Sequence, residues 1–224
     1  MNIKRFRASS LADIMTDPKG KGEVLSVGAK TAITKMAKEF VYGYDEFISN
    51  KYMDKGNRVE NDSIDLLNAV LGTNYSKNEE RKNNDWITGE CDIVGDNRII
   101  DIKSSWSLAT FPVLPSLGEE TRYEWQGRAY MMLWDMPEFS IAYCLVDTPQ
   151  DLIGYEDRKL HEVSHITPDL RVTLVHYKRD KELEDKIKFK VDAAREYYDR
   201  VIYDITDQHQ FFNLTKEANV KNDL

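Results

Sequence analysis

The sequence has 224 residues, of which 41% are hydrophobic and 31% are charged, a length and composition that suit a single α/β domain with a sizeable core. Its apolar runs are shorter than the roughly 18 residues of a membrane span, and residues 1–15 lack an apolar stretch of signal-peptide length. We therefore expect a cytoplasmic protein without a membrane segment. Two cysteines, Cys91 and Cys144, are too few for a disulfide scaffold, and we expect reduced, buried thiols.

The net charge of −8 is unevenly distributed along the chain. Residues 1–38 carry a net charge of +5, which leaves −13 on the remainder. This balance argues against a protein that coats nucleic acid by bulk attraction. A basic N-terminal segment over an acidic body fits DNA held in a local groove, and it equally fits an ordinary solvated helix face.

The first third of the chain has helical spacing. Ser9 and Ser10 can cap a short helix over residues 11–16, and a loop follows over 18–28. Apolar residues at helical spacing predict an amphipathic helix over 29–44. A further helix is expected over 46–70, with Gly56 as the place where it would break, and Gly72 begins the turn that ends it.

The period then changes from helical to alternating. Residues 86–94 and 98–103 each read as a strand, and the turn-forming residues 95–97 between them predict a hairpin. A helix over 119–134, a strand over 139–146, a helix over 149–162, a strand over 171–177 and a helix over 181–205 follow. This order predicts an α/β (α+β) fold, in which a mixed central β-sheet is flanked by helices. We expect one domain, with a basic helical segment at 1–45, a core at 46–180 and a tail at 206–224.

Acidic residues gather at the predicted hairpin. Asp101 and Lys103 are two apart on a strand, so their side chains leave the same face, while Ile100 and Ile102 leave the other. Asp92 is placed on the preceding strand, where the hairpin brings its carboxylate beside that of Asp101. Two converging carboxylates repel each other, and a hard divalent cation such as Mg²⁺ relieves that repulsion.

A lysine and a helical glutamate complete the expected site. Lys103 can orient or deprotonate a water molecule, or offset charge on a pentavalent phosphate. Glu60, on the helix before the hairpin, can hold a second metal ion or position the first, and Gly56 can let DNA approach closely. These groups are what metal-assisted phosphodiester hydrolysis requires. The plain alternative is an exposed hairpin with a cross-strand salt bridge, which contributes only ~0–1 kcal/mol.

Two motifs carry a resemblance to known nucleases. Asp92 followed by Asp101-x-Lys103 resembles the PD-(D/E)xK nuclease signature, and Gln126 with Tyr130 resembles the Q-x-x-x-Y element of that superfamily's exonuclease branch. The motifs occur in family order across roughly residues 6–203, and the chain most resembles the phage lambda-type exonuclease family. Cys91 stands where the signature has proline, and Asp101 stands where close relatives have glutamate.

The resemblance implies a restriction-endonuclease-like core and two-metal hydrolysis. It implies that Mg²⁺ or Mn²⁺ ions are held by Glu60, Asp92, Asp101 and the backbone carbonyl of Ile102. It also implies that Lys103 assists the attacking water, that Gln126 hydrogen-bonds nearby and that Tyr130 supports the site or contacts DNA. The family digests one strand of linear duplex DNA from its 5′ end, often as a trimer. It works with a single-strand annealing protein during phage recombination, in the cytoplasm of a bacterial host.

Further contacts with DNA are assigned to Arg7, Ser9, Ser10 and Trp106. Ser9 matches a serine of the family's 5′-phosphate pocket, although it fits an ordinary N-cap as well. Glu90 stands at another pocket position, where its carboxylate would repel phosphate. Trp106 can stack on a separated strand or pack in the core. Two other functions stay open: a structure-specific or nicking DNA endonuclease of the same superfamily, and a non-catalytic DNA-binding module.

Overall fold

The computed structural model describes residues 4–46 and 49–222, with side chains described up to residue 207. The chain divides into two compact units. The first combines Met1–Ala12 with Ile48–Asp185, and the second combines Asp13–Phe47 with Lys186–Leu224. Every residue predicted for the functional site belongs to the first unit. Among the described helices, none is both long and apolar enough to span a membrane.

The first unit is built on a four-stranded mixed sheet in the order β4-β5-β6-β7. Its strands are β4 (Ile93–Val94), β5 (Arg98–Ser104), β6 (Glu138–Cys144) and β7 (Val172–Lys178). β5 and β6 are parallel and pair along their whole length, while the other two pairs are antiparallel. Helix α5 (Thr121–Trp134) makes the connection that a parallel pair requires. The predicted mixed sheet with flanking helices is confirmed.

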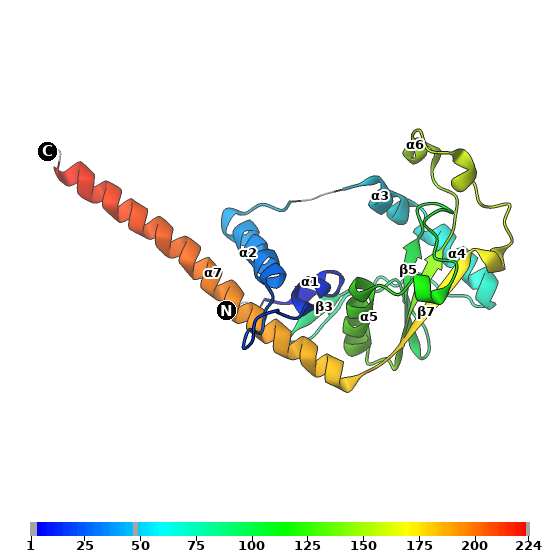
Figure 1. Ribbon diagram of the computed structural model, residues 1–224, viewed down its shortest axis with the longest axis horizontal. Coiled ribbons are helices and arrows are strands. Elements are labelled where there is room, and N and C mark those ends of the chain that lie inside the picture. Colours follow the sequence, from blue (N-terminus) through cyan, green and yellow to red (C-terminus); the bar gives the residue numbers. More distant parts are fainter. Residues whose placement is uncertain (1–3, 47–48, 223–224) are drawn as a thin grey trace. The chain divides into compact units, whose positions relative to one another are not determined.

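The two faces of β5 have different partners. Ile100 and Ile102 are buried with Leu67 and other apolar residues of α4 (Glu60–Leu71), which packs on that face. Asp101 and Lys103 leave the opposite face, on which α5 lies. Figure 1 shows α4 and α5 on either side of the strands. The alternation predicted for this strand therefore separates an apolar core from a polar site.

Helix α5 can approach the sheet closely because of a glycine. A Cβ atom at Gly127 would lie 2.0 Å from the ring of Phe139 on β6, a distance at which only glycine fits. The close approach brings the neighbouring Gln126 and, one turn later, Tyr130 over the polar face of β5. The glycine in the middle of a helix, where it ordinarily costs about 1 kcal/mol, is thus explained by packing.

The segment before β5 differs from the predicted hairpin. Residues 86–94 form two short strands in different sheets, because β3 (Ile87–Gly89) pairs with β1 (Phe6–Arg7) and β2 (Lys82–Asn83). Of the two strands in residues 86–94, only β4 pairs with β5, so the hairpin is shorter than expected. Asp92 lies in the connection between β3 and β4, and its placement on a strand was wrong. The small sheet had no alternating signal of its own, since two of its strands are two residues long.

Two helical predictions also need correction. The helix over 46–70 is interrupted at Val59, which separates α3 (Lys51–Arg58) from α4, and Gly56 lies inside α3. The helix over 149–162 is reduced to α6 (Gln150–Ile153) and the 3-10 turn η3 (Arg158–Leu160). Gly154 follows α6 with a φ of +63°, a backbone conformation that ends the helix. A further turn, η4 (Pro168–Leu170), leads into β7.

The second unit is helical. Helix α2 (Val27–Tyr42) is capped by the Ser26 hydroxyl, which accepts a hydrogen bond from the backbone N–H of Ala29. Helix α7 (Lys181–Asn222) continues beyond its predicted end near residue 205. Lys190 on α7 is buried, and its ammonium donates to the backbone carbonyls of Thr16 and Val24. The short helix α1 (Ala12–Met15), preceded by the 3-10 turn η1 (Ala8–Ser10), was predicted over 11–16.

Candidate active site

The predicted acidic residues line one cleft of about 980 Å³ in the first unit. Its lining includes all four residues on which the sequence interpretation depends, namely Glu60, Asp92, Asp101 and Lys103. Its walls come from α3, α5, the start of the chain and the ends of the strands. Residues distant in sequence therefore meet at one hollow, as the motif spacing predicted.

Asp101 and Lys103 form the centre of the site. The ammonium of Lys103 lies 2.6 Å from Oδ2 of Asp101 and 4.4 Å from the ring centre of Tyr123. Burial lowers the pKa of Lys103, but the charges of Asp101 and Asp92 outweigh burial and raise it. The cation–π contact adds a second favourable term for the ammonium. The lysine is therefore held as a cation beside the carboxylate.

Asp92 is held beside Asp101 from outside the sheet. Its Oδ2 accepts a hydrogen bond of 2.6 Å from the backbone N–H of Ile102. Burial, followed by the charges of Asp101 and Glu60, raises the pKa of Asp92 to about 8, although the Ile102 N–H and Lys103 oppose this. The repulsion between the carboxylates, which the sequence predicted, is thus present in the fold.

Glu60 reaches the cleft from the first turn of α4. Its carboxylate is ion-paired with Lys77, a residue that the sequence interpretation did not single out. Lys77 lies in the segment between α4 and β2, which gave no periodic signal. Two carboxylates of the cleft therefore each have a lysine partner: Lys77 pairs with Glu60, and Lys103 pairs with Asp101.

Gln126 and Tyr130 form a hydrogen-bonded chain behind the acids. The amide nitrogen of Gln126 donates to Oδ1 of Asp101 at 3.2 Å and to the hydroxyl of Tyr130 at 2.9 Å. That hydroxyl donates to the backbone carbonyl of Glu90 at 2.9 Å. Burial, with the charge of Asp101, raises the pKa of Tyr130, so its hydroxyl stays a donor. The Q-x-x-x-Y element therefore orients Asp101 and braces the loop that leads to Asp92.

The oxygens of the cleft fit a hard divalent cation. Asp101 is 1% exposed, and its Oδ2 lacks an aligned hydrogen-bond donor among the described residues, although Lys103 is near. Within the described residues, no three His, Cys, Asp or Glu side chains are already grouped as a metal site, and the Glu60 carboxylate is paired with Lys77. Mg²⁺ commonly takes one or two carboxylates together with water and substrate phosphate. Asp92 and Asp101 suit that requirement, and Glu60 lines the same cleft.

The predicted DNA contacts are only partly gathered at the cleft. Arg7 and Ser9 are exposed and line it, whereas Ser10 does not, and the Ser10 hydroxyl donates to the carbonyl of Arg7. Trp106 also lines the cleft but is 8% exposed, in edge contact with the rings of Tyr52 and His161. These contacts favour packing over stacking on DNA for Trp106.

Glu90 has a partner that changes its expected effect. Its carboxylate is ion-paired with Arg81, which also lines the cleft, at 3.0 Å. The repulsion of phosphate expected from Glu90 alone is therefore reduced. Arg81 was missed because it lies next to β2, a strand too short to be recognised from the sequence.

Comparison with solved structures identifies the fold. A phage-related exonuclease from Haemophilus somnus 129PT is 38% identical, with a TM-score of 0.85, and the match covers 90% of this chain and 96% of that one. An alkaline exonuclease from Laribacter hongkongensis, also solved in complex with dAMP, is 16% and 17% identical in the two structures. Its TM-scores are 0.68 and 0.67, over 94% of this chain and 95% of that one. No protein-family model and no curated protein matches the chain.

The fold and the site define an enzyme of the nuclease class, in which an acidic cleft with an adjacent lysine lies on a mixed sheet. The 38% identity, over nearly the full length of both chains, is decisive for the family. The chain belongs to the phage lambda-type exonuclease family.

Proposed function

We propose that this protein is a Mg²⁺- or Mn²⁺-dependent exonuclease that hydrolyses phosphodiester bonds of linear duplex DNA from the 5′ end. The observation that carries the proposal is the buried Oδ2 of Asp101, which faces the same cleft as Asp92, Glu60 and Lys103. The Laribacter hongkongensis exonuclease has been solved with dAMP, and a deoxyribonucleotide is the product class expected here.

The proposed reaction assigns a task to each side chain. Asp92, Asp101 and the Ile102 carbonyl would hold one divalent ion. Glu60 would break its ion pair with Lys77 and either complete that site or hold a second divalent ion. The bound metal would supply Lewis-acid activation of water and of the scissile phosphate. Lys103 orients the attacking water, whose oxygen adds to phosphorus as the bond to the leaving sugar oxygen breaks. Gln126 keeps Asp101 in position, while Arg7 and Ser9 contact the phosphate backbone.

The decisive experiment uses end-labelled linear duplexes and a covalently closed circle of the same sequence. Purified protein should release nucleotides from the linear DNA in Mg²⁺, leave the circle intact and be inactive in EDTA. Duplexes with a 5′-phosphate or a 5′-hydroxyl on the labelled strand test end dependence. Cutting of the circle would identify an endonuclease, and binding without cleavage would identify a non-catalytic module.

Lys103→Ala provides the test of the mechanism. It should abolish cleavage while the protein still melts cooperatively, because the side chain is not part of the apolar core. The matched control is Lys159→Ala, an exposed lysine outside the cleft lining, which should retain activity. Full activity of Lys103→Ala would contradict the proposed role of this lysine.

We extend the proposal to the biological setting that family membership suggests. The protein would act as a homotrimer together with a single-strand annealing protein during phage-type recombination, in the bacterial cytoplasm. Light scattering after size exclusion tests the trimer: a mass of about 26 kDa, that of one chain, would contradict it. Co-purification with an annealing protein expressed beside it tests the partner.

A further inference from the structure

We propose that Lys55 is a positioning residue, which fixes α3 as one wall of the cleft and so sets how substrate fits against the acidic site. The proposal depends on the proposed function only for the identity of that substrate. Lys55 itself does not line the cleft.

Helix α3 has one side on the cleft and almost nothing apolar to hold it there. Tyr52, Met53, Gly56 and Asn57 line the cleft. Among the eight residues of α3, all of which the structure describes, the buried one is Lys55, with 0% exposure. Helices are ordinarily held by the burial of an apolar stripe. The attachment of α3 is therefore mostly polar: the Tyr52 ring meets Trp106 edge-on, but Lys55 is the side chain that the helix buries.

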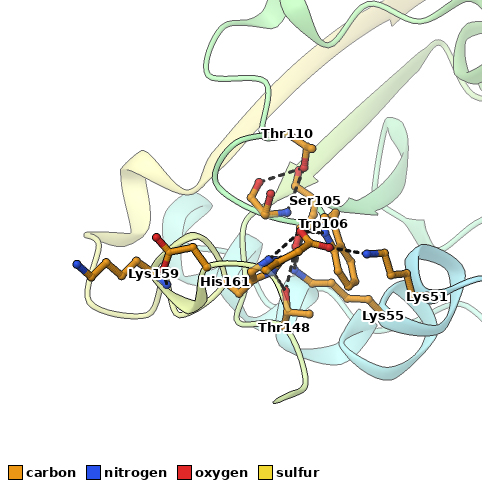
Figure 2. Close-up of polar contacts among 11 residues, drawn as sticks. Lys51, Lys55, Ser105, Trp106, Thr110, Thr148, Lys159 and His161 are labelled. Atoms are coloured by element: carbon orange, nitrogen blue, oxygen red, sulfur yellow. Dashed lines mark hydrogen bonds and ion pairs between the residues drawn. The ribbon is translucent and has the colours of Figure 1, made fainter. Parts of the chain in front are cut away.

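Lys55 uses its whole hydrogen-bonding capacity for this attachment. Its ammonium donates to the backbone carbonyls of Ser105 at 2.6 Å and Trp106 at 3.1 Å, both labelled in Figure 2. It also donates to the backbone carbonyl of Val146 at 2.9 Å. An ammonium has three donors, so all are satisfied. The first two carbonyls follow β5, and the third follows β6. Lys55 thus ties α3 to the segments that directly follow the two parallel strands. Its nearest acceptor, Ser105, is two residues beyond Lys103.

The acceptors are themselves held in place. The carbonyl of Trp106 also accepts a hydrogen bond from the hydroxyl of Thr148 at 2.9 Å, and that hydroxyl lies 3.1 Å from Nδ1 of His161. The indole N–H of Trp106 donates to Glu156 at 3.0 Å. Figure 2 shows Lys55, Trp106, Thr148 and His161 converging on this point. Lys55 therefore binds a rigid set of carbonyls rather than a loose loop.

Two ion pairs flank Lys55 on the same side of α3. Lys51 pairs with Glu156, and Arg58 makes two hydrogen bonds to Asp151 at 2.7 and 2.9 Å. Both pairs are substantially exposed and therefore screened by solvent, although the two-pronged geometry of Arg58–Asp151 makes it the stronger of the two. Loss of Lys55, by contrast, removes a buried donor from carbonyls that water reaches poorly. We therefore expect Lys55 to dominate the attachment.

The acidic site should survive the loss of this attachment. Helix α4, which carries Glu60, has its own apolar contacts through Ile64, Leu66 and Leu67. Lys103 and Asp101 are fixed by β5 and α5. Removing Lys55 should hence free α3 while the catalytic groups stay in place. This predicts a rise in KM with a much smaller change in kcat.

The test compares Lys55→Met with Lys190→Met. Lys190 is a chemically matched control, because it is also buried and donates to two backbone carbonyls, but in the second unit. In Lys55→Met, amide hydrogen exchange across residues 51–58 should accelerate about tenfold or more, while β5 and β6 remain protected. KM for linear duplex should rise about tenfold with kcat within about threefold. Lys190→Met should leave exchange in α3 unchanged.

Each other outcome is informative. Unchanged exchange in α3, or equal acceleration in α3, β5 and β6, would overturn the proposal, because Lys55 would then be dispensable or a general core residue. Lys55→Arg, which keeps a cationic donor, should restore protection of α3 in part. If Lys55→Met does not melt cooperatively, Lys55→Gln carries the same comparison. The exchange measurement needs no activity, so it can fail or succeed independently of the proposed nuclease function.

Discussion

The backbone N–H of Ile102 donates a hydrogen bond to Oδ2 of Asp92, and this contact joins the two halves of the acidic site. Strand β4 pairs with β5 only at Ile99 and Ile100, so the edge of β5 beyond β4 is open to a side chain. Asp92 precedes β4 and takes this position. The shortness of β4 is therefore what lets a loop carboxylate stand beside Asp101.

Asp92→Asn should stabilise the metal-free protein and remove its response to metal. The change eliminates one of two repelling carboxylates, while its amide oxygen can still accept from Ile102. In EDTA the free energy of unfolding should rise by on the order of 1 kcal/mol, because a raised pKa marks a carboxylate that destabilises the fold, at about 1.4 kcal/mol per pKa unit. A site saturated to about 100 times its Kd should stabilise the wild type by ~2.7 kcal/mol, and the Asp92→Asn variant should not gain this.

Thermal melts in EDTA and in Mg²⁺ measure both effects. Asp96→Asn, in the exposed turn of the same hairpin, is the control and should respond to Mg²⁺ like the wild type. An equal Mg²⁺-induced rise in Tm for Asp92→Asn would show that Asp92 is not a ligand.

Lys77→Gln should lower the Mg²⁺ concentration needed for half-maximal cleavage. Lys77 is ion-paired with Glu60, so it competes with a metal for the same carboxylate. The pair is partly exposed, and such pairs contribute ~0–1 kcal/mol, which corresponds to at most about a fivefold shift. Titration of activity against Mg²⁺ measures it, with Lys82→Gln on β2 as the control. A higher Mg²⁺ requirement would mean that Lys77 orients Glu60 instead of competing for it.

The core of the fold was predictable because its signals are local. The alternation of β5 and the helical spacing of α5 each extend over seven or more residues, and both elements lie where they were expected. Asp101 and Lys103 share a face because they are two residues apart on a strand. Gln126 and Tyr130 share a face because they are four residues apart on a helix.

The features that the sequence did not predict depend on contacts between residues distant in the chain. The two-residue strand β2 has no period to detect, and Lys77, which pairs with Glu60, lies in the irregular segment before it. Lys55 looks like an ordinary surface lysine in a highly charged helix, and only the fold shows that it is buried. The helix breaks at Val59 and not at the predicted Gly56, because glycine is tolerated inside a helix when other residues support that position.

Tyr130→Phe should reduce both stability and turnover. The hydroxyl links Gln126 to the carbonyl of Glu90. Its removal leaves the buried Gln126 amide without this acceptor and the partly buried Glu90 carbonyl without this donor, and it loosens the amide that orients Asp101. A loss of about 1–3 kcal/mol in unfolding free energy is expected. Tyr155→Phe, on a fully exposed tyrosine, should change neither quantity. Unaltered kcat in a destabilised Tyr130→Phe would limit this residue to packing.

Gly56→Ala should stabilise the protein while weakening substrate binding. A Cβ atom at Gly56 meets nothing within 4 Å, and alanine favours a helix by about 1 kcal/mol over glycine. Gly56 also lines the cleft, so the added methyl group would stand where substrate approaches. KM should therefore rise as Tm rises, and Gly56→Leu should enlarge the KM effect. Higher stability with unchanged KM in both variants would show that substrate does not approach this side of α3.

The stability of the protein should depend on pH through Lys55. Burial lowers the pKa of Lys55 from 10.5 to about 8, against an opposing effect of Asp147. Between these pH values the unfolded chain still binds the proton that the folded protein has released. The free energy of unfolding should consequently rise with pH above about 8, by at most ~1.4 kcal/mol per pH unit, and be independent of this group below it.

The comparison that isolates this effect is denaturant unfolding of the wild type and Lys55→Met at several values from pH 7 to pH 10. The methionine variant has no proton to release at this position, so the difference in unfolding free energy between the two proteins should grow in favour of the wild type above about pH 8. Lys159→Met, at an exposed position, corrects for the loss of one positive charge. A constant difference across the range would mean that the three carbonyls around the ammonium offset the cost of burying it, and that Lys55 holds α3 as a cation throughout.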